Sequence, residues 1–173
     1  MFPLGHGTGD KRCPSAALQT WLRWRCVTVL MIDQQKKGLG LLKYSGVYLV
    51  IFVTMLVVDM IWLRLIAVSV YERGMGDLLA ESPNLVAAAA FYLLFPVGLL
   101  VFGVVPAETS SIWKAAGMGA LFGFFAYATY DLTNLAVVKN WPLGLSLLDM
   151  AWGTLVSGLS TAAGKAGLDF LNR

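Results

Sequence analysis

The sequence predicts an all-α integral membrane protein, a four-helix up-down bundle with both termini cytoplasmic. Of its 173 residues, 58% are hydrophobic, and the mean hydropathy is +0.70. The apolar residues gather in four blocks, each close to the roughly 20 residues that a helix needs to cross a bilayer. Short connections between the blocks favour antiparallel neighbours, and in lipid only helices or closed barrels satisfy the backbone.

Helix breakers delimit the four predicted spans. Ser82-Pro83-Asn84 precedes the second span, Thr109 or Ser110 is the candidate N-cap of the third, and Pro96 is expected to kink the second. We expect the spans to cover about residues 44–70, 85–105, 112–138 and 145–166, so that 44–173 form the transmembrane domain.

Residues 1–43 are predicted to form a basic cytoplasmic tail. This tail is either disordered or partly a gene-model extension upstream of a true start at Met31; alternatively, Trp21, Leu22 and Trp24 form a short interfacial helix. The orientation follows from the positive-inside rule. Lys114 and the C-terminus add positive charge to the same side, whereas the opposite loops carry only Arg73 and Lys139. The tail itself has seven basic residues: Lys11, Arg12, Arg23, Arg25, Lys36, Lys37 and Lys43.

Three carboxylates lie within or at the edge of the predicted spans, and the topology places all of them in the outer half. They are Asp59, Asp131 and Asp149. An acid in hydrocarbon is costly and is usually retained for pairing or function. Tyr127 and Asn134 share a helical face with Asp131.

The sequence also allows a structural interpretation of the acids, which is weakest for Asp131 because it lies in a polar run with Thr133 and Asn134. Asp149 is placed to cap its helix or to pair with Lys139, and Asp59 is expected to find a partner on another helix. Two Asp-Met-x-Trp segments, Asp59 to Trp62 and Asp149 to Trp152, favour either an inverted repeat of two-helix halves or a coincidence.

Small residues predict where helices pack. Gly119 and Gly123 form a GxxxG pair in the third span, and Gly153, Ser157 and Thr161 form a stripe in the fourth. Aromatic residues at the span ends, with Trp62, Trp141 and Trp152 among them, are expected to form the outer interfacial belt.

Catalytic and metal chemistry are poorly supported. The only histidine is His6 in the tail, and Cys13 and Cys26 also lie outside the spans. The spans therefore lack a Cys or His to activate a nucleophile or to bind zinc. We predict no catalytic residue, no metal ligand and no cofactor.

The stretch Ala126-Tyr127-Ala128-Thr129-Tyr130-Asp131-Leu132-Thr133-Asn134-Leu135-Ala136, followed by Lys139-Asn140-Trp141-Pro142, resembles a family of small bacterial predicted membrane proteins of unknown function. The segments Asp59-Met60-Ile61-Trp62-Leu63 and Asp149-Met150-Ala151-Trp152-Gly153 also match it, and the resemblance covers about residues 44–170. It implies a multi-pass protein of the bacterial inner (plasma) membrane and supplies no activity.

The sequence therefore predicts an acidic pocket in the periplasmic half of the bundle. We expect it to bind or pass a small polar solute, a cation or proton, or a lipid headgroup. The alternative is a non-catalytic accessory or assembly subunit whose acids staple helices together, and a lipid-modifying enzyme ranks last. The expected partners are the lipid bilayer and either a homo-oligomer or a larger membrane complex, without nucleic acid. The expected lining is Asp59, Asp131, Asn134, Asp149, Tyr127, Trp62 and Trp152.

Overall fold

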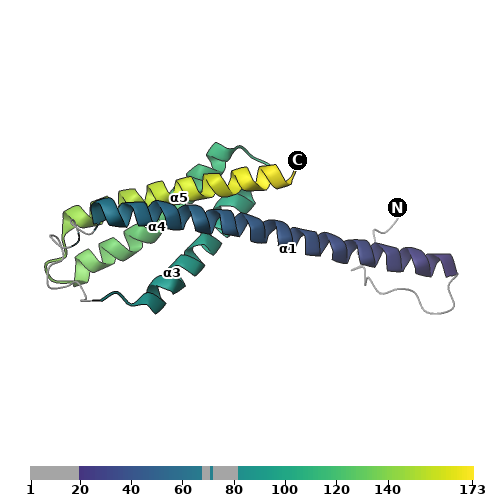
Figure 1. The fold of residues 1–173 in the computed structure, drawn as a ribbon, viewed down its shortest axis with the longest axis horizontal. Coiled ribbons are helices and arrows are strands. Elements are labelled where there is room, and N and C mark those ends of the chain that lie inside the picture. Colours follow the sequence, from purple (N-terminus) through teal and green to yellow (C-terminus); the bar gives the residue numbers. More distant parts are fainter. Residues whose placement is uncertain (1–19, 68–70, 72–81) are drawn as a thin grey trace, which may run out of the picture. The chain divides into compact units, whose positions relative to one another are not determined.

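The computed structural model describes residues 20–67, 71 and 82–173, and within these residues every regular element is helical. Residues Lys43–Arg173 form one compact unit, to which the packing below refers. In chain order the elements are α1 (Thr20–Trp62), η1 (Leu63–Ala67), α3 (Leu85–Gly98), η3 (Leu99–Val104), η4 (Val105–Ala107), α4 (Ile112–Val137) and α5 (Leu143–Leu171), as Figure 1 shows. The all-α prediction is confirmed.

Three helical stretches of the described chain are long and apolar enough to cross a membrane. These are Gly40–Leu65, Leu85–Ala107 and Leu143–Leu171. The 26 residues of α4 span about 39 Å at ~1.5 Å per residue, which is also long enough. However, Lys114 and the polar run from Tyr130 to Asn134 make α4 less apolar than the others.

The region predicted as a tail contains the first part of α1. Residues 20–43 are helical and belong to α1, which continues to Trp62. The reason is visible in the sequence, because no proline interrupts the chain between residues 20 and 62. Residues 1–19 lie outside the described part of the chain.

The helix starts also refine the predicted boundaries. Asn84 caps α3 by accepting hydrogen bonds from the backbone N–H groups of Val86 and Ala87, both at 3.1 Å. Ser111, rather than Thr109 or Ser110, caps α4, because it is the residue with extended backbone whose hydroxyl accepts from Lys114 N.

Helices α4 and α5 lie side by side along their length (Figure 1). The close approach is made by the predicted small-residue stripes. A Cβ atom added at Gly119 would lie 2.9 Å from the Ser157 carbonyl oxygen, and one added at Gly123 would overlap the Ser157 side chain. Across the same interface, the Tyr127 ring covers Gly153. The predicted packing of the third span on the fourth is confirmed.

The connection from α4 to α5 is short, as predicted. Asn140 in this turn has φ of 60°, the left-handed region that asparagine tolerates better than most residues. The turn makes α4 and α5 antiparallel.

Helix α3 changes its winding after Pro96. The α-helix ends at Gly98 and continues as the π-helical segment η3. A proline cannot donate a backbone hydrogen bond to the preceding turn, and an insertion into helical winding is one way to accommodate the loss. The segment η3 packs on α4 and α5, whereas the first half of α3 leaves most of its apolar side chains exposed.

Around Val47 and Ile51, helix α1 packs against the C-terminal half of α5 and against η3. Ile51 fills the space beside Gly164 of α5, where an added Cβ would overlap its side chain. Val47, Leu99, Val104 and Leu168 complete a buried apolar cluster with Ile51. The polar residues described next lie farther along α1, toward its C-terminal end.

Candidate functional site

Asp59 joins α1 to α5 through a tryptophan. Its carboxylate, 5% exposed, accepts a hydrogen bond of 2.8 Å from Trp152 Nε1. The Trp152 ring in turn stacks on Trp62 with centroids 4.3 Å apart and planes 9° apart. The two Asp-Met-x-Trp segments thus meet in space, and the expected partner of Asp59 on another helix is confirmed.

Trp62 and Trp152 were expected both near the interfacial belt and among the pocket residues. In the structure Trp62 is buried and Trp152 half-buried in the α1–α5 contact, and neither is among the described residues that line the cavity below. A buried indole N–H usually finds a hydrogen-bond acceptor, and the Asp59 carboxylate is the acceptor for Trp152. The equivalent contact from Trp62 to Asp149 is not formed, so the meeting of the two segments is not symmetric.

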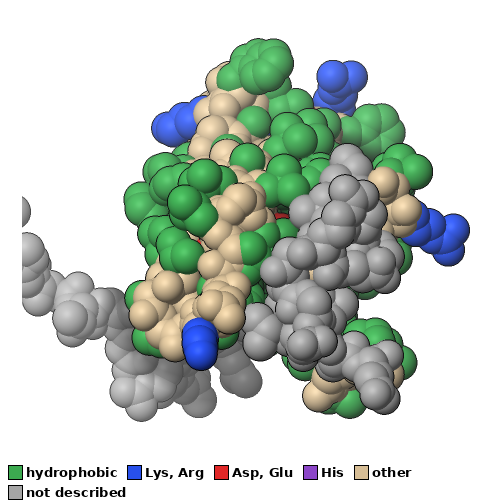
Figure 2. Space-filling model, turned by 90° about the vertical axis from the view of Figure 1, so that its left-hand side faces the viewer, with side chains coloured by type: hydrophobic (Ala, Val, Ile, Leu, Met, Phe, Trp, Pro, Cys, Tyr) green, Lys and Arg blue, Asp and Glu red, His purple; other side chains and the backbone are tan. Residues whose placement is uncertain are grey.

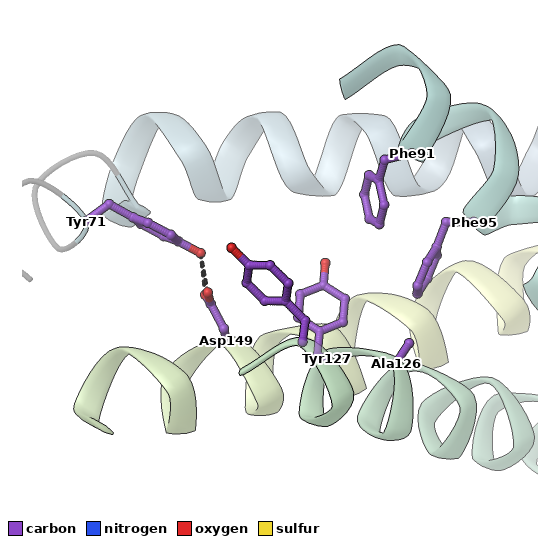
Figure 3. A pocket seen from close by; sticks show the side chains of 7 residues that line it. Tyr71, Phe91, Phe95, Ala126, Tyr127 and Asp149 are labelled. Atoms are coloured by element: carbon purple, nitrogen blue, oxygen red, sulfur yellow. Dashed lines mark hydrogen bonds between the residues drawn. The ribbon is translucent and has the colours of Figure 1, made fainter. Parts of the chain in front are cut away.

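Asp149 is held by a tyrosine that lies after the first span. Tyr71 donates its hydroxyl to the Asp149 carboxylate, with both oxygens 2.5 Å from the Tyr71 oxygen. Figure 3 shows the two side chains facing each other. Asp149 makes no ion pair with Lys139, whose side chain is exposed, so the predicted pairing is wrong.

Beside this pair lies a cavity of about 450 Å³ between α3, α4 and the start of α5. Its wall is almost entirely aromatic, and Asp149 supplies a carboxylate. In Figure 3, Phe91 and Phe95 of α3 point toward Tyr127 of α4. Among the described residues, the lining is Tyr71, Phe91, Phe95, Ala126, Tyr127, Tyr130 and Asp149.

Asp131 is the most isolated of the three acids. It is fully buried, and neither of its carboxylate oxygens has a hydrogen-bond partner among the described residues. Ser146 of α5 lies close by but outside hydrogen-bond geometry, and its hydroxyl accepts from Trp141 Nε1 at 2.9 Å. Asp131 is also near enough to Asp149 for the two charges to interact.

Tyr127 stands at the centre of the group. Its ring contacts Phe95 edge-on at 6.1 Å between centroids, and its hydroxyl lies within electrostatic range of all three acids. Asn134 is half-buried near Tyr130 and does not line the cavity. The structure therefore groups the predicted residues into an Asp59–tryptophan contact and an Asp131–Asp149 region joined by Tyr127.

Sequence reasoning missed most of the aromatic wall. Phe91 and Phe95 are four residues apart and share one face of α3, which was the available signal. Tyr92 of the same helix lies near Asp59. Tyr71 and Asp149 are 78 positions apart in the sequence, and no local pattern predicts their contact.

A second polar cluster lies near the middle of α1 and was also missed. Glu108, after η4, accepts hydrogen bonds from Lys43 Nζ at 2.8 Å and from the Tyr44 hydroxyl at 2.9 Å. The Lys43 ammonium, with help from Tyr44, holds the pKa of Glu108 below its ordinary value. Lys165 was counted with the cytoplasmic C-terminus, but it is buried within α5 and pairs with Asp169 one turn away.

The surface agrees with a lipid environment. In Figure 2 hydrophobic side chains cover much of the described part of the face, a few Lys and Arg side chains project from it, and hardly any carboxylate is visible. Exposed apolar residues occur on every spanning helix, with Leu49 of α1, Leu94 of α3 and Leu155 of α5 more than half exposed. A water-soluble protein would rarely leave such continuous apolar surface uncovered.

The fold and its surface thus define a helical integral membrane protein with buried acids in its core. Residues 44–166 match the family described as predicted membrane protein DUF2177, and the chain belongs to this family. No curated protein and no solved structure matches the chain. The resemblance noted in the sequence is therefore confirmed at the level of the family.

Proposed function

We propose that this protein binds a positively charged solute within the membrane, through Asp131 and Asp149. The single observation that carries the proposal is Asp131, a fully buried acid without a partner among the described residues. Removing a carboxylate from water costs several kcal/mol unless a partner compensates. A bound cation, or a proton in transit, supplies that compensation.

The basic residues of the described chain support this choice of charge. Lys43 and Lys165 are engaged by Glu108 and Asp169, at a distance from the three acids along the helices. None of the described Lys or Arg side chains pairs with Asp59, Asp131 or Asp149. The negative charge of the three acids is therefore not neutralised by a described basic side chain. In a region of low dielectric, such a charge attracts cations strongly.

The first test is cation-dependent stability. We expect the thermal unfolding temperature of the full chain in lipid nanodiscs to rise saturably with one of sodium, ammonium or choline chloride, compared at equal chloride concentration. A ligand at 100 times its Kd adds about 2.7 kcal/mol to the free energy of unfolding. The double variant Asp131→Asn and Asp149→Asn should lose this response, and Glu108→Gln, which removes an acid outside the group, should keep it. Equal behaviour of all three cations would contradict the proposal.

The proposal also places the protein in the bacterial inner membrane with four passes. In this arrangement α4 is the remaining span, both termini are cytoplasmic, and the acids lie in the periplasmic half. The basic tail supports the orientation, and the length of α4 supports the fourth pass. Movement of the solute across the membrane would require a homo-oligomer, because four helices enclose little space for a path.

Cysteine labelling tests the topology. In a Cys13→Ser, Cys26→Ser background, we expect Lys139→Cys to react with an impermeant maleimide on intact spheroplasts. Thr109→Cys and Arg173→Cys should react only after permeabilisation; all three positions are exposed on the protein. Labelling of positions 109 and 139 from the same side would show that α4 does not cross the membrane.

A further inference from the structure

The cavity beside Asp149 has an unusual wall for a site that holds charge. Of the seven lining residues in the described part of the chain, five are aromatic, and these come from three separate segments. Phe91 and Phe95 have ring centroids 5.1 Å apart, and Phe95 meets Tyr127 edge-on at 89°. The rings therefore surround a space rather than form a single stack.

We infer that this cavity is an aromatic cage for an organic ammonium group, which rests on the cation-binding function proposed above and names its ligand class. Aromatic faces carry negative quadrupolar charge and attract ammonium groups within about 6 Å of the ring centroid. Asp149 supplies the full negative charge at one side of the cage.

The size and chemistry of the cavity favour an organic cation over a metal ion. A volume of about 450 Å³ lies within the range of roughly 300–1,000 Å³ typical of small-molecule pockets. A hard metal ion requires about six oxygen ligands in a shell around it. The lining residues that the structure describes offer one carboxylate and three phenol hydroxyls, and the hydroxyl of Tyr71 is already directed at Asp149. Methyl or methylene groups around a quaternary nitrogen, in contrast, pack well against rings.

The cavity is reachable from the side of the bundle. Phe91 is 38% exposed and Tyr130 is 57% exposed, although both line the cavity. The first half of α3 makes little contact with α4 or α5, and the tight packing begins only at η3. An amphiphilic amine in the surrounding lipid can thus approach between α3 and α4.

Choline and its neutral isostere 3,3-dimethylbutan-1-ol test the inference, because they differ in charge and hardly in shape. Equilibrium binding is measured on the full chain in dodecyl maltoside micelles, whose headgroup carries neither an ammonium group nor a negative charge. We expect choline to bind about tenfold to thirtyfold more tightly than the isostere, as desolvated cation–π contacts allow. Equal binding of the two would overturn the inference, since the cavity would then recognise only apolar shape.

Two variants at one position and a matched control refine the test. Tyr130→Leu should weaken choline binding about twofold to fivefold, and Tyr130→Phe should keep it, because the ring face does the work. Phe125→Leu is the control: Phe125 lies on the same helix and is 59% exposed, but it does not line the cavity. Loss in both Tyr130→Leu and Phe125→Leu would overturn the inference by showing an effect on the helix.

The outcomes separate this inference from the proposed function. If sodium or ammonium stabilises the protein through Asp131 and Asp149 but choline does not bind, the acid group binds cations and the cage is wrong. If no cation binds, both are wrong.

Discussion

Gly123→Ala is expected to lower the free energy of unfolding by about 1–3 kcal/mol, the usual cost of overpacking a tight core. The added methyl group would overlap Ser157 Oγ and the backbone carbonyl oxygen of Gly153. One of these atoms is backbone and the other belongs to a short side chain, so neither can move away easily. Helices α4 and α5 must therefore separate or rotate. Thermal or denaturant unfolding in nanodiscs measures the loss.

Gly117→Ala is the matched control on the same helix. An added Cβ at Gly117 meets no atom within 4 Å. Alanine also favours the helix over glycine by about 0.5–1 kcal/mol, so this variant should be as stable as the parent or slightly more stable. Equal destabilisation by the two substitutions would show that the α4–α5 contact is not the cause.

Separation of α4 from α5 would also disturb the cavity. Tyr127 covers Gly153 across this interface and forms part of the cavity wall. The small-residue stripes are therefore more than packing devices, because they fix the position of the aromatic ring that stands among the three acids.

The sequence predicted the parts of this structure that depend on local pattern. Two pairs of small residues, each four residues apart, mark one face of α4 and one face of α5, and these faces meet. The pairs are Gly119 with Gly123 and Ser157 with Thr161. Helix breakers act in the same local way, since Pro83 and Pro142 stand two residues and one residue before the starts of α3 and α5. Periodicity and helix breakers are properties of short segments.

The contacts that build the site depend on tertiary structure and were mostly not predictable. No local sequence pattern at Tyr71 predicts its contact with Asp149. Trp62 has the residue type and the position near a span end that are typical of an interfacial belt, although its ring stacks on Trp152. The sequence singled out Asp131, because it lies in a run of polar residues within an apolar helix. Only the fold, however, distinguishes an acid with a partner from one without.

That distinction leads to opposite expectations for the same substitution at Asp59 and Asp131. Asp59→Leu would leave the Trp152 indole N–H without its acceptor, and an unsatisfied buried donor costs about 1–3 kcal/mol. Asp59→Asn keeps an oxygen acceptor and should remain close to the parent. At Asp131, where no hydrogen bond is lost, Asp131→Leu should raise the unfolding temperature, because an unpaired buried acid is replaced by a side chain that suits its surroundings.

These three variants, compared by thermal unfolding in nanodiscs at low cation concentration, decide between the two interpretations of the acids. Stabilisation by Asp131→Leu means that this acid is kept against the interest of the fold, as expected of a binding group. Destabilisation comparable to that of Asp59→Leu would make Asp131 a staple between helices as well. The accessory-subunit interpretation would then be preferred, because each of the three acids would be needed to stabilise the fold.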